Sequence, residues 1–325
     1  MNAIATVVRT LIVLASAGLC LSSNAQPYPT KPIRFVVPFA PGGATDILAR
    51  MVARRLTDTL GQQVIVDNRG GAAGRIGTEI VARAIPDGYT IAIGHVGTLA
   101  MNPTLFTNLS YDPLKDLTPI SLIAMMPNAL VVSKSLPVTS VKDLIAMARA
   151  KPNTILYGSG GNGSSNHLGI VYLELLAKIK LTHVSYKGGG PAIVDLIAGN
   201  ISVMMPGLLP VAPHIKSGRI RLIAVSTRAR LPIFPEVPTI AESGVSGYEY
   251  SNWMGVVGPA KIPPAIVRKL NEHLAEATAH PEFKTRLAVE GGDATNSSSA
   301  QFRTHIKEEI ARWAPVVKAS GPRRN

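Results

Sequence analysis

Glycines and hydroxyl side chains gather in one turn whose composition is typical of an anion-binding site. The turn is GSGGNGSSNHL, residues 158–168, and it contains Ser159, Ser164 and Ser165. A short apolar run precedes the turn and an apolar helical pattern follows it, so we expect a strand, a turn and a helix in that order. The first N–H groups of a helix have no partner within the helix and carry a partial positive charge. Together with the serine hydroxyls, they could bind a carboxylate.

The same turn matches two nucleotide-binding patterns only in part. Gly158, Gly160 and Gly163 satisfy GxGxxG, but residues 183–187 lack the acidic residue that a dinucleotide site needs about 20 positions further on. A phosphate loop requires Lys followed by Ser or Thr, where this chain has Ser164 and Ser165. The sequence therefore favours a simple carboxylate site. One of the serines could instead serve only as the helix N-cap.

Two further glycine-rich turns also connect a strand to a helix. Gly42 and Gly43 follow the strand expected at residues 33–37, and YKGGGP, residues 186–191, precedes a third apolar helix. Each turn directs N–H groups of a helix N-terminus outward, where an anion could bind. A glycine pair at such a turn can also be explained by its conformational freedom alone, so both interpretations stay open.

The strands and helices that position these turns alternate along the chain. A βαβαβ order over the first hundred residues predicts a mostly parallel sheet covered by helices, with ligands beyond the carboxyl ends of the strands. The loop with Gly97 and Thr98 opens at that edge and could contact a polar ligand or form a simple tight turn. Apolar segments at residues 120–124 and 129–132 indicate a crossover into a second α/β domain. The Pro- and Gly-rich residues 232–263 suit a return crossing.

Composition limits the class of protein. The chain has 325 residues with 46% hydrophobic and 16% charged content, enough for two buried cores. Its formal net charge is +13, which would suit anionic partners. The basic residues are spread along the chain and aromatic residues make up only 5%, so we do not expect nucleic acid binding.

The N-terminus has the pattern of an export signal. Arg9 precedes an apolar stretch, residues 11–21, and Ser23 and Ala25 are small residues at the two positions that a signal peptidase reads. We expect cleavage after residue 25 and a periplasmic protein without stable membrane insertion, since no later segment has 18 uninterrupted apolar residues. The single Cys lies within this signal, so the mature chain would have no disulfide.

Motifs of common catalytic centres are missing from the sequence. It has no GxSxG elbow, no HExxH pair and no cysteine nucleophile in the mature chain. We expect no catalytic residues, no metal site and no cofactor, and we interpret His167 as a hydrogen-bonded structural residue. Two alternatives stay open, because catalytic groups need only meet in space. One is an exported hydrolase of small esters that uses Ser164 or Ser165, and the other is a ligand-sensing subunit of a signalling system.

Several segments together resemble those of the tripartite tricarboxylate transporter receptors, also called the Bug family of periplasmic solute-binding proteins. The resemblance covers nearly all of residues 27–321. It rests on motifs in a fixed order: YPTKPIRFVVPFAPGGATD, IVDNRGGAAGRIGTE, PDGYTI, GSGGNGSSNHL, YKGGGPA, RLPIFPEVPTIAESG and the segment around Trp313. Such a series is far more specific than any single glycine turn.

The resemblance implies a two-domain periplasmic binding protein of the type II-like flytrap class, with its ligand in the interdomain cleft. Such a receptor binds a mono-, di- or tricarboxylate, aromatic ones included, partly through bridging waters, and delivers it to separate membrane subunits. We expect a monomer with a signal peptide at 1–25, domain 1 at 26–124, domain 2 at 125–230, and the return crossing with the rest of domain 1 at 231–325.

The resemblance also implies where the ligand binds. Residues 38–46 would form the ligand loop of the first domain, and residues 161–165 would form the carboxylate clamp of the second. The expected ligand-binding residues are Pro38, Phe39, Gly42, Gly43, Asp46, Gly97, Thr98, Ser159, Gly161, Gly163, Ser164, Ser165, Lys187 and Gly188.

Two positions depart from the family pattern. Pro206 and Gly207 stand where members often carry an acidic residue, which argues against a ligand with an amino group. Leu99 stands where a polar residue is common, so we expect a more apolar cleft.

Overall fold

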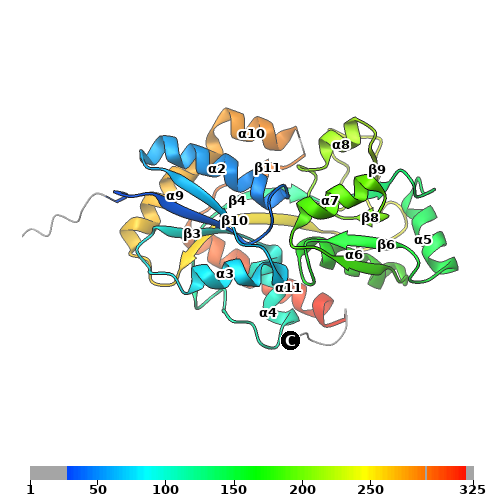
Figure 1. The fold of residues 1–325 in the computed structure, drawn as a ribbon, viewed down its shortest axis with the longest axis horizontal. Coiled ribbons are helices and arrows are strands. Elements are labelled where there is room, and N and C mark those ends of the chain that lie inside the picture. Colours follow the sequence, from blue (N-terminus) through cyan, green and yellow to red (C-terminus); the bar gives the residue numbers. More distant parts are fainter. Residues whose placement is uncertain (1–27, 290, 320–325) are drawn as a thin grey trace, which may run out of the picture. The chain divides into compact units, whose positions relative to one another are not determined.

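The computed structural model describes residues 28–289 and 291–319, and from Lys31 onward the chain forms one compact unit. The expected signal peptide lies outside the described residues. The unit contains two sheets, each with its own helices (Figure 1). We call them the first lobe and the second lobe.

The first lobe is built on a six-stranded sheet. Its strand order is β11-β4-β10-β3-β1-β2. The strands are β1 (Ile33–Val37), β2 (Val64–Asn68), β3 (Thr90–His95), β4 (Leu117–Pro127), β10 (Ser251–Pro259) and β11 (Asp293–Ala294). Only β1, β2 and β3 pair in parallel, and they are the strands that helices connect directly.

Helices cover both faces of this sheet. In Figure 1, α2 and α10 lie above the sheet, and α3, α4 and α11 lie below it. The helical segments of this lobe are α2 (Ala44–Leu60), η1 (Ala72–Gly74), α3 (Arg75–Ala82), η2 (Gly97–Met101), α4 (Asn102–Leu105), α9 (Pro264–Ala279), α10 (Pro281–Ala288) and α11 (Ser299–Ala319). Both α9 and α11 pack against β4, so the last helices of the chain cover the first sheet.

The second lobe has a five-stranded sheet in the order β7-β6-β8-β5-β9. Its strands are β5 (Ala129–Ser133), β6 (Leu156–Ser159), β7 (Thr182–Ser185), β8 (Val203–Met204) and β9 (Ile220–Val225). Its helices are α5 (Val141–Ala150), α6 (Ser165–Ala177), α7 (Gly189–Ala198) and α8 (Ala212–Lys216). Ser140 caps α5 by accepting a hydrogen bond from the Asp143 N–H.

The two-domain α/β class is confirmed, but the sheets are mixed rather than mostly parallel. In the first lobe, β10 runs antiparallel to β3 and β4. In the second lobe, β5 runs antiparallel to β8 and β9. These antiparallel strands lie next to the passages between lobes, where the chain enters a sheet without the helical crossover that parallel pairing requires.

Strand β10 is the main element that sequence reasoning did not find. It occupies an inner position of the first sheet, within the segment expected to be only a return crossing. Gly255 and Pro259 obscure its strand pattern. The glycine is needed there, because a Cβ at position 255 would overlap the ring of Phe302 in α11.

The chain passes between the lobes at two adjacent places. Strand β4 ends at Pro127 and β5 begins at Ala129, so Asn128 alone separates them. On the return path, the Ser226 hydroxyl accepts a hydrogen bond from the Asn128 N–H and donates one to the Tyr250 carbonyl, at 3.0 and 2.5 Å. The two passages are thus hydrogen-bonded to each other.

Candidate functional site: a pocket at three helix N-termini

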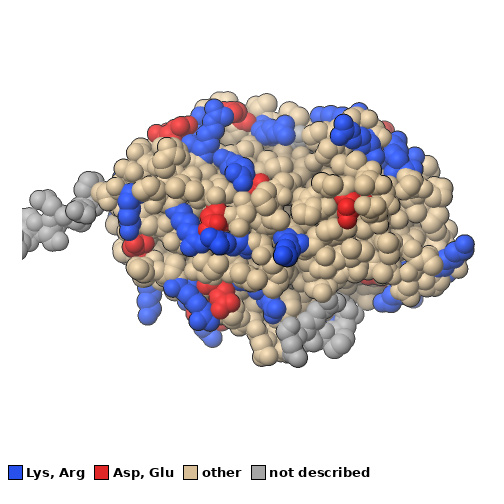
Figure 2. Space-filling view, viewed as in Figure 1, with Lys and Arg blue, Asp and Glu red and all other residues tan. Residues whose placement is uncertain are grey.

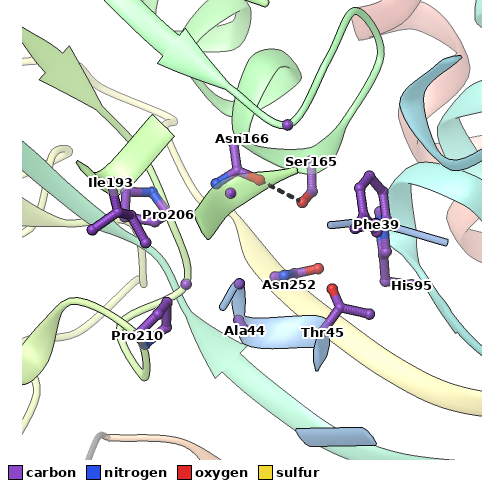
Figure 3. Close-up of a pocket in the computed structure, with 14 residues that line it drawn as sticks. Phe39, Ala44, Thr45, His95, Ser165, Asn166, Ile193, Pro206, Pro210 and Asn252 are labelled. Atoms are coloured by element: carbon purple, nitrogen blue, oxygen red, sulfur yellow. Dashed lines mark hydrogen bonds between the residues drawn. The ribbon is translucent and has the colours of Figure 1, made fainter. Parts of the chain in front are cut away.

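A small pocket lies where both lobes meet the N-termini of α2, α6 and α7 (Figure 3). Its volume is about 30 Å³, which is room for roughly two water molecules. A carboxylate of several carbons would therefore require the lobes to separate. The lining residues are Phe39, Gly43, Ala44, Thr45, His95, Gly160, Ser165, Asn166, Gly189, Ile193, Pro206, Gly207, Pro210 and Asn252.

The N-terminus of α2 reaches the pocket through Gly43, Ala44 and Thr45. Gly43 is the N-cap residue, and no side chain caps the helix there. The helix begins here because the Pro- and Gly-containing turn ends β1, and it stops at Gly61 in the left-handed conformation. Its first N–H groups thus lie at the wall of the pocket with the partial positive charge of the helix.

Asp46 positions this loop and does not line the pocket. Its carboxylate accepts hydrogen bonds from the Gly42 N–H at 3.0 Å and from the Asn68 amide at 2.9 Å, and it forms an ion pair with Arg50. Burial alone would raise the pKa of Asp46, but the hydrogen bonds from Arg50, Gly42 and Asn68 outweigh it and lower the pKa. Asn68 also donates to the Phe39 carbonyl, so this polar cluster holds the ligand loop in place.

Phe39 and His95 form one wall of the pocket, with ring centroids 4.9 Å apart. His95 is buried, and burial lowers its pKa from 6.5 to about 3, so it is neutral near pH 7. Its Nδ1 accepts a hydrogen bond from the Gly97 N–H at 2.8 Å. The neutral ring therefore carries its proton on Nε2, which can act as a donor.

Gly97 and Thr98 support His95 from behind. A Cβ on Gly97 would lie 3.0 Å from His95 Nδ1 and 3.2 Å from the Ser165 nitrogen, so only glycine fits between the lobes here. The Thr98 hydroxyl is fully buried and bonds the backbone of His95. Neither residue is in the pocket lining. Leu99 is also fully buried and is not in the pocket lining, so a more apolar cleft stays a prediction.

At the N-terminus of α6, two adjacent serines have different surroundings. Ser164 is the N-cap residue, and its hydroxyl accepts a hydrogen bond from the His167 N–H at 3.4 Å. Ser165 lies at the first helical position, and its hydroxyl donates to Asn166 Oδ1 at 3.4 Å inside the pocket (Figure 3). Ser164 therefore caps the helix and does not line the pocket, whereas the Ser165 hydroxyl lies in the pocket, where a ligand oxygen could replace Asn166 Oδ1 as its acceptor.

Ser159, Gly161 and Gly163 shape the turn ahead of α6. The buried Ser159 hydroxyl accepts from the Gly161 N–H at 3.1 Å and lies 2.6 Å from His183 Nε2. Gly161 and Gly163 have φ values of 116° and 88°, which favour glycine. The Gly163 N–H donates to His167 Nδ1 at 3.2 Å, which agrees with the structural role expected for this buried histidine.

The ligand loops of the two lobes touch through their backbones. The Ala40 N–H donates to the Lys187 carbonyl at 3.1 Å. A Cβ on Gly188 would lie 2.7 Å from the Ala40 nitrogen, and a Cβ on Gly190 would overlap the Pro41 carbonyl oxygen. The glycines therefore allow the close approach of the lobes, and the structure is a closed form.

The pocket includes some of the expected residues and excludes others. Phe39, Gly43 and Ser165 line it. The other expected residues support the loops or lie elsewhere: Pro38, Gly42, Asp46, Gly97, Thr98, Ser159, Gly161, Gly163, Ser164, Lys187 and Gly188. Sequence reasoning missed Asn252 on β10, which is 4% exposed and whose Oδ1 has no hydrogen-bond partner among the described residues. Only recognition of β10 as a strand could have indicated it.

Known proteins are similar to this chain in sequence and in fold. Residues 48–321 match the model of the tripartite tricarboxylate transporter family receptor. The chain belongs to this receptor family. It is 37% identical over 311 residues to the protein BugT of Bordetella pertussis, with 95% of each chain covered.

Two solved structures resemble this family member over about nine tenths of its chain. One is an R. palustris protein with adipate, at 40% identity and a TM-score of 0.87, covering 90% of this chain and 98% of the other. The other is MatC from Rhodopseudomonas palustris with bound malate, at 32% identity and a TM-score of 0.86, covering 89% and 100%.

Charges on the receptor surface agree with its composition. Figure 2 shows Lys and Arg side chains scattered over the visible face of both lobes, with fewer Asp and Glu between them and no continuous basic stripe. Among residues 28–289 and 291–319, no helix has the length and hydrophobicity needed to cross a bilayer.

Proposed function

We propose that this receptor captures a small mono-, di- or tricarboxylate in the periplasm and delivers it to the membrane subunits of a tripartite transporter. It acts as a monomer, exported by its N-terminal signal and without a catalytic step. Its lobes act as two domains whose boundaries lie near residues 125 and 231, and the ligand enters when they separate.

The observation that carries this proposal is the meeting of three helix N-termini in one pocket without charged side chains. None of the lining residues is Lys, Arg, Asp or Glu, and His95 is neutral. Each helix N-terminus is equivalent to about half a positive charge, so three give on the order of +1.5. A carboxylate is the small solute that such a field favours, and adipate and malate in the related receptors have this chemistry.

Neutral donors complete the site. Ser165, Thr45 and the Nε2 proton of His95 can each donate a hydrogen bond to a carboxylate oxygen. Pro206, Gly207 and Pro210 form the opposite wall and offer no acidic group to an ammonium. The pocket therefore disfavours amino acids relative to simple carboxylates.

Isothermal titration of the mature chain against a carboxylate panel would test the proposal. The panel should contain malate, adipate, citrate and benzoate, with the amino acid glutamate as the amine-bearing comparison. We expect saturable binding of at least one carboxylate and none of glutamate. Absence of heat and of any melting-temperature shift with every carboxylate would contradict the proposal.

A further inference from the structure

A second cavity is lined by residues of both lobes, and it adjoins the same turn as the pocket, at Gly161. Its volume is about 620 Å³, within the range of small-molecule sites. The first lobe contributes the segment around η1, Arg75 and Phe106, and the second contributes Gly161, Asn162 and residues 185–187. Gly161 lines this outer cavity, whereas Gly160 lines the pocket.

The charges of the outer cavity differ from those of the pocket. Arg75 from the first lobe and Lys187 from the second line it, and no acidic residue does. Among residues 28–289 and 291–319, neither cation has an acidic group within ion-pair distance. Two nearby carboxylates have other partners: Glu79 on α3 pairs with Arg83 and accepts from the Ser110 hydroxyl, and Asp195 accepts a hydrogen bond from the Tyr186 hydroxyl at 2.5 Å.

Arg75 has a fixed side chain and a hydrogen-bond donor that a ligand could use. Its guanidinium carbon lies 4.0 Å from the centroid of the Phe106 ring, so the ring fixes the side chain by a cation–π contact. The Nε atom is shielded from solvent and has no hydrogen-bond partner among the described residues. A shielded N–H donor on a charged group without a partner is costly, and an oxyanion in the cavity would supply the acceptor.

Polar groups of the second lobe complete the opposite side. Lys187 and Ser185 are exposed there, and Asn162, whose Oδ1 lies 3.0 Å from His183 Nδ1, also lines the cavity. One cation from each lobe matches a polyvalent oxyanion, since separate oxygens of one anion could pair with the two cations.

We propose that the outer cavity is a second ligand site, which binds a small polyvalent oxyanion with carboxylate or phosphate groups across the two lobes. It is separate from the carboxylate pocket of the proposed function and does not depend on it. Because the anion contacts both lobes only when they approach each other, its binding favours the closed form.

Titration of the full mature chain with inorganic phosphate and, separately, with citrate tests this site at low ionic strength in a chloride buffer. The informative variants are Arg75→Gln and Lys187→Gln, one in each lobe. Each removes a charged hydrogen-bond donor, so each should weaken binding roughly ten- to hundredfold. Tighter binding of citrate than of phosphate would identify polycarboxylates as the preferred form, and the reverse would identify phosphates.

Two controls separate the outer site from the pocket and from general charge effects. Arg83→Gln removes an exposed cation from the end of α3 and should leave anion binding unchanged. Ser165→Ala changes the pocket and should leave phosphate binding unchanged.

The proposal would be overturned if neither phosphate nor citrate binds. It would also be overturned if their binding survives in both Arg75→Gln and Lys187→Gln. Loss of phosphate binding in Ser165→Ala alone would place the anion in the pocket instead. Because Lys187 is exposed, its variant should fold even if Arg75→Gln does not.

Discussion

The two adjacent serines at the start of α6 allow ligand binding and helix capping to be measured separately. Ser165→Ala should remove a hydroxyl that lines the pocket and can donate to a carboxylate. A hydrogen bond to a charged group contributes about 1.5 to 3 kcal/mol, so the affinity for the bound carboxylate should fall roughly 10- to 150-fold. Ser164→Ala should instead remove the cap that accepts the His167 N–H. That change costs about 1 kcal/mol of unfolding free energy. Isothermal titration and urea unfolding of both variants would give the two quantities.

Ser140→Ala is the matched control for the capping effect. Ser140 caps α5 in the same way, by accepting the Asp143 N–H at 3.1 Å, and it is not in the pocket lining. It should lower stability about as much as Ser164→Ala and leave affinity unchanged. If Ser165→Ala binds as tightly as the parent while Ser164→Ala loses affinity without losing stability, the assignment of the two serines is wrong.

Three other predictions follow from buried contacts. Gly190→Ala should weaken ligand affinity roughly 5- to 150-fold, since overpacking against the Pro41 carbonyl costs about 1 to 3 kcal/mol in the closed form only. The higher helix propensity of Ala should keep the melting temperature at or above that of the parent. Gly189→Ala, whose Cβ would have no neighbour nearer than 3.8 Å, is the control for closure only, because Gly189 lines the pocket, and X-ray scattering without ligand would show whether Gly190→Ala alone loses the closed form. Glu309→Ala should lower the unfolding free energy by roughly 2 to 6 kcal/mol, because it leaves the indole N–H groups of Trp253 and Trp313 without their shared acceptor. Glu309→Gln keeps an acceptor and should lose less in denaturant unfolding followed by tryptophan fluorescence. The folded-state pKa of Asp46 is lowered from 3.8, so its contribution to stability is complete above that pH and is lost as the pH falls through the folded value. Asp46→Asn should therefore lose stability near neutral pH and show a smaller further loss in acid than the parent; equal acid sensitivity of both proteins would contradict this.

Local signals in the sequence were sufficient for the turns that build the site. The strand at residues 33–37 and a serine cap at the start of α6 depend on neighbouring residues, and the structure has both. The three glycine-rich turns do precede helices, and these helix N-termini meet at one pocket.

Side-chain direction within those turns could not be predicted from composition. Ser159 and Ser165 are both hydroxyls of one turn, yet Ser159 bonds the backbone of Gly161 and only Ser165 lines the pocket. Lys187 lies beside the glycines of α7, yet it lines the outer cavity. The direction of each side chain depends on how its loop packs against the other lobe. That packing involves residues distant in sequence, so local patterns do not predict it.

Local sequence signals also could not predict which distant strands pair with each other. Asn252 enters the pocket because β10 lies between β3 and β4, whose residues are more than a hundred positions earlier in the chain. Gly255 lowers the strand propensity of this segment and is required only because the Phe302 ring packs there.

The three helix N-termini also determine how the receptor can change during evolution. Backbone N–H groups are present whatever side chain a residue carries, so substitutions cannot easily remove the part of the pocket that attracts an anion. The side chains around it, such as Phe39, Asn166, Ile193 and Asn252, can vary without loss of that attraction. New ligand specificities can therefore arise by changing these few positions, while affinity for a carboxylate is inherited with the fold.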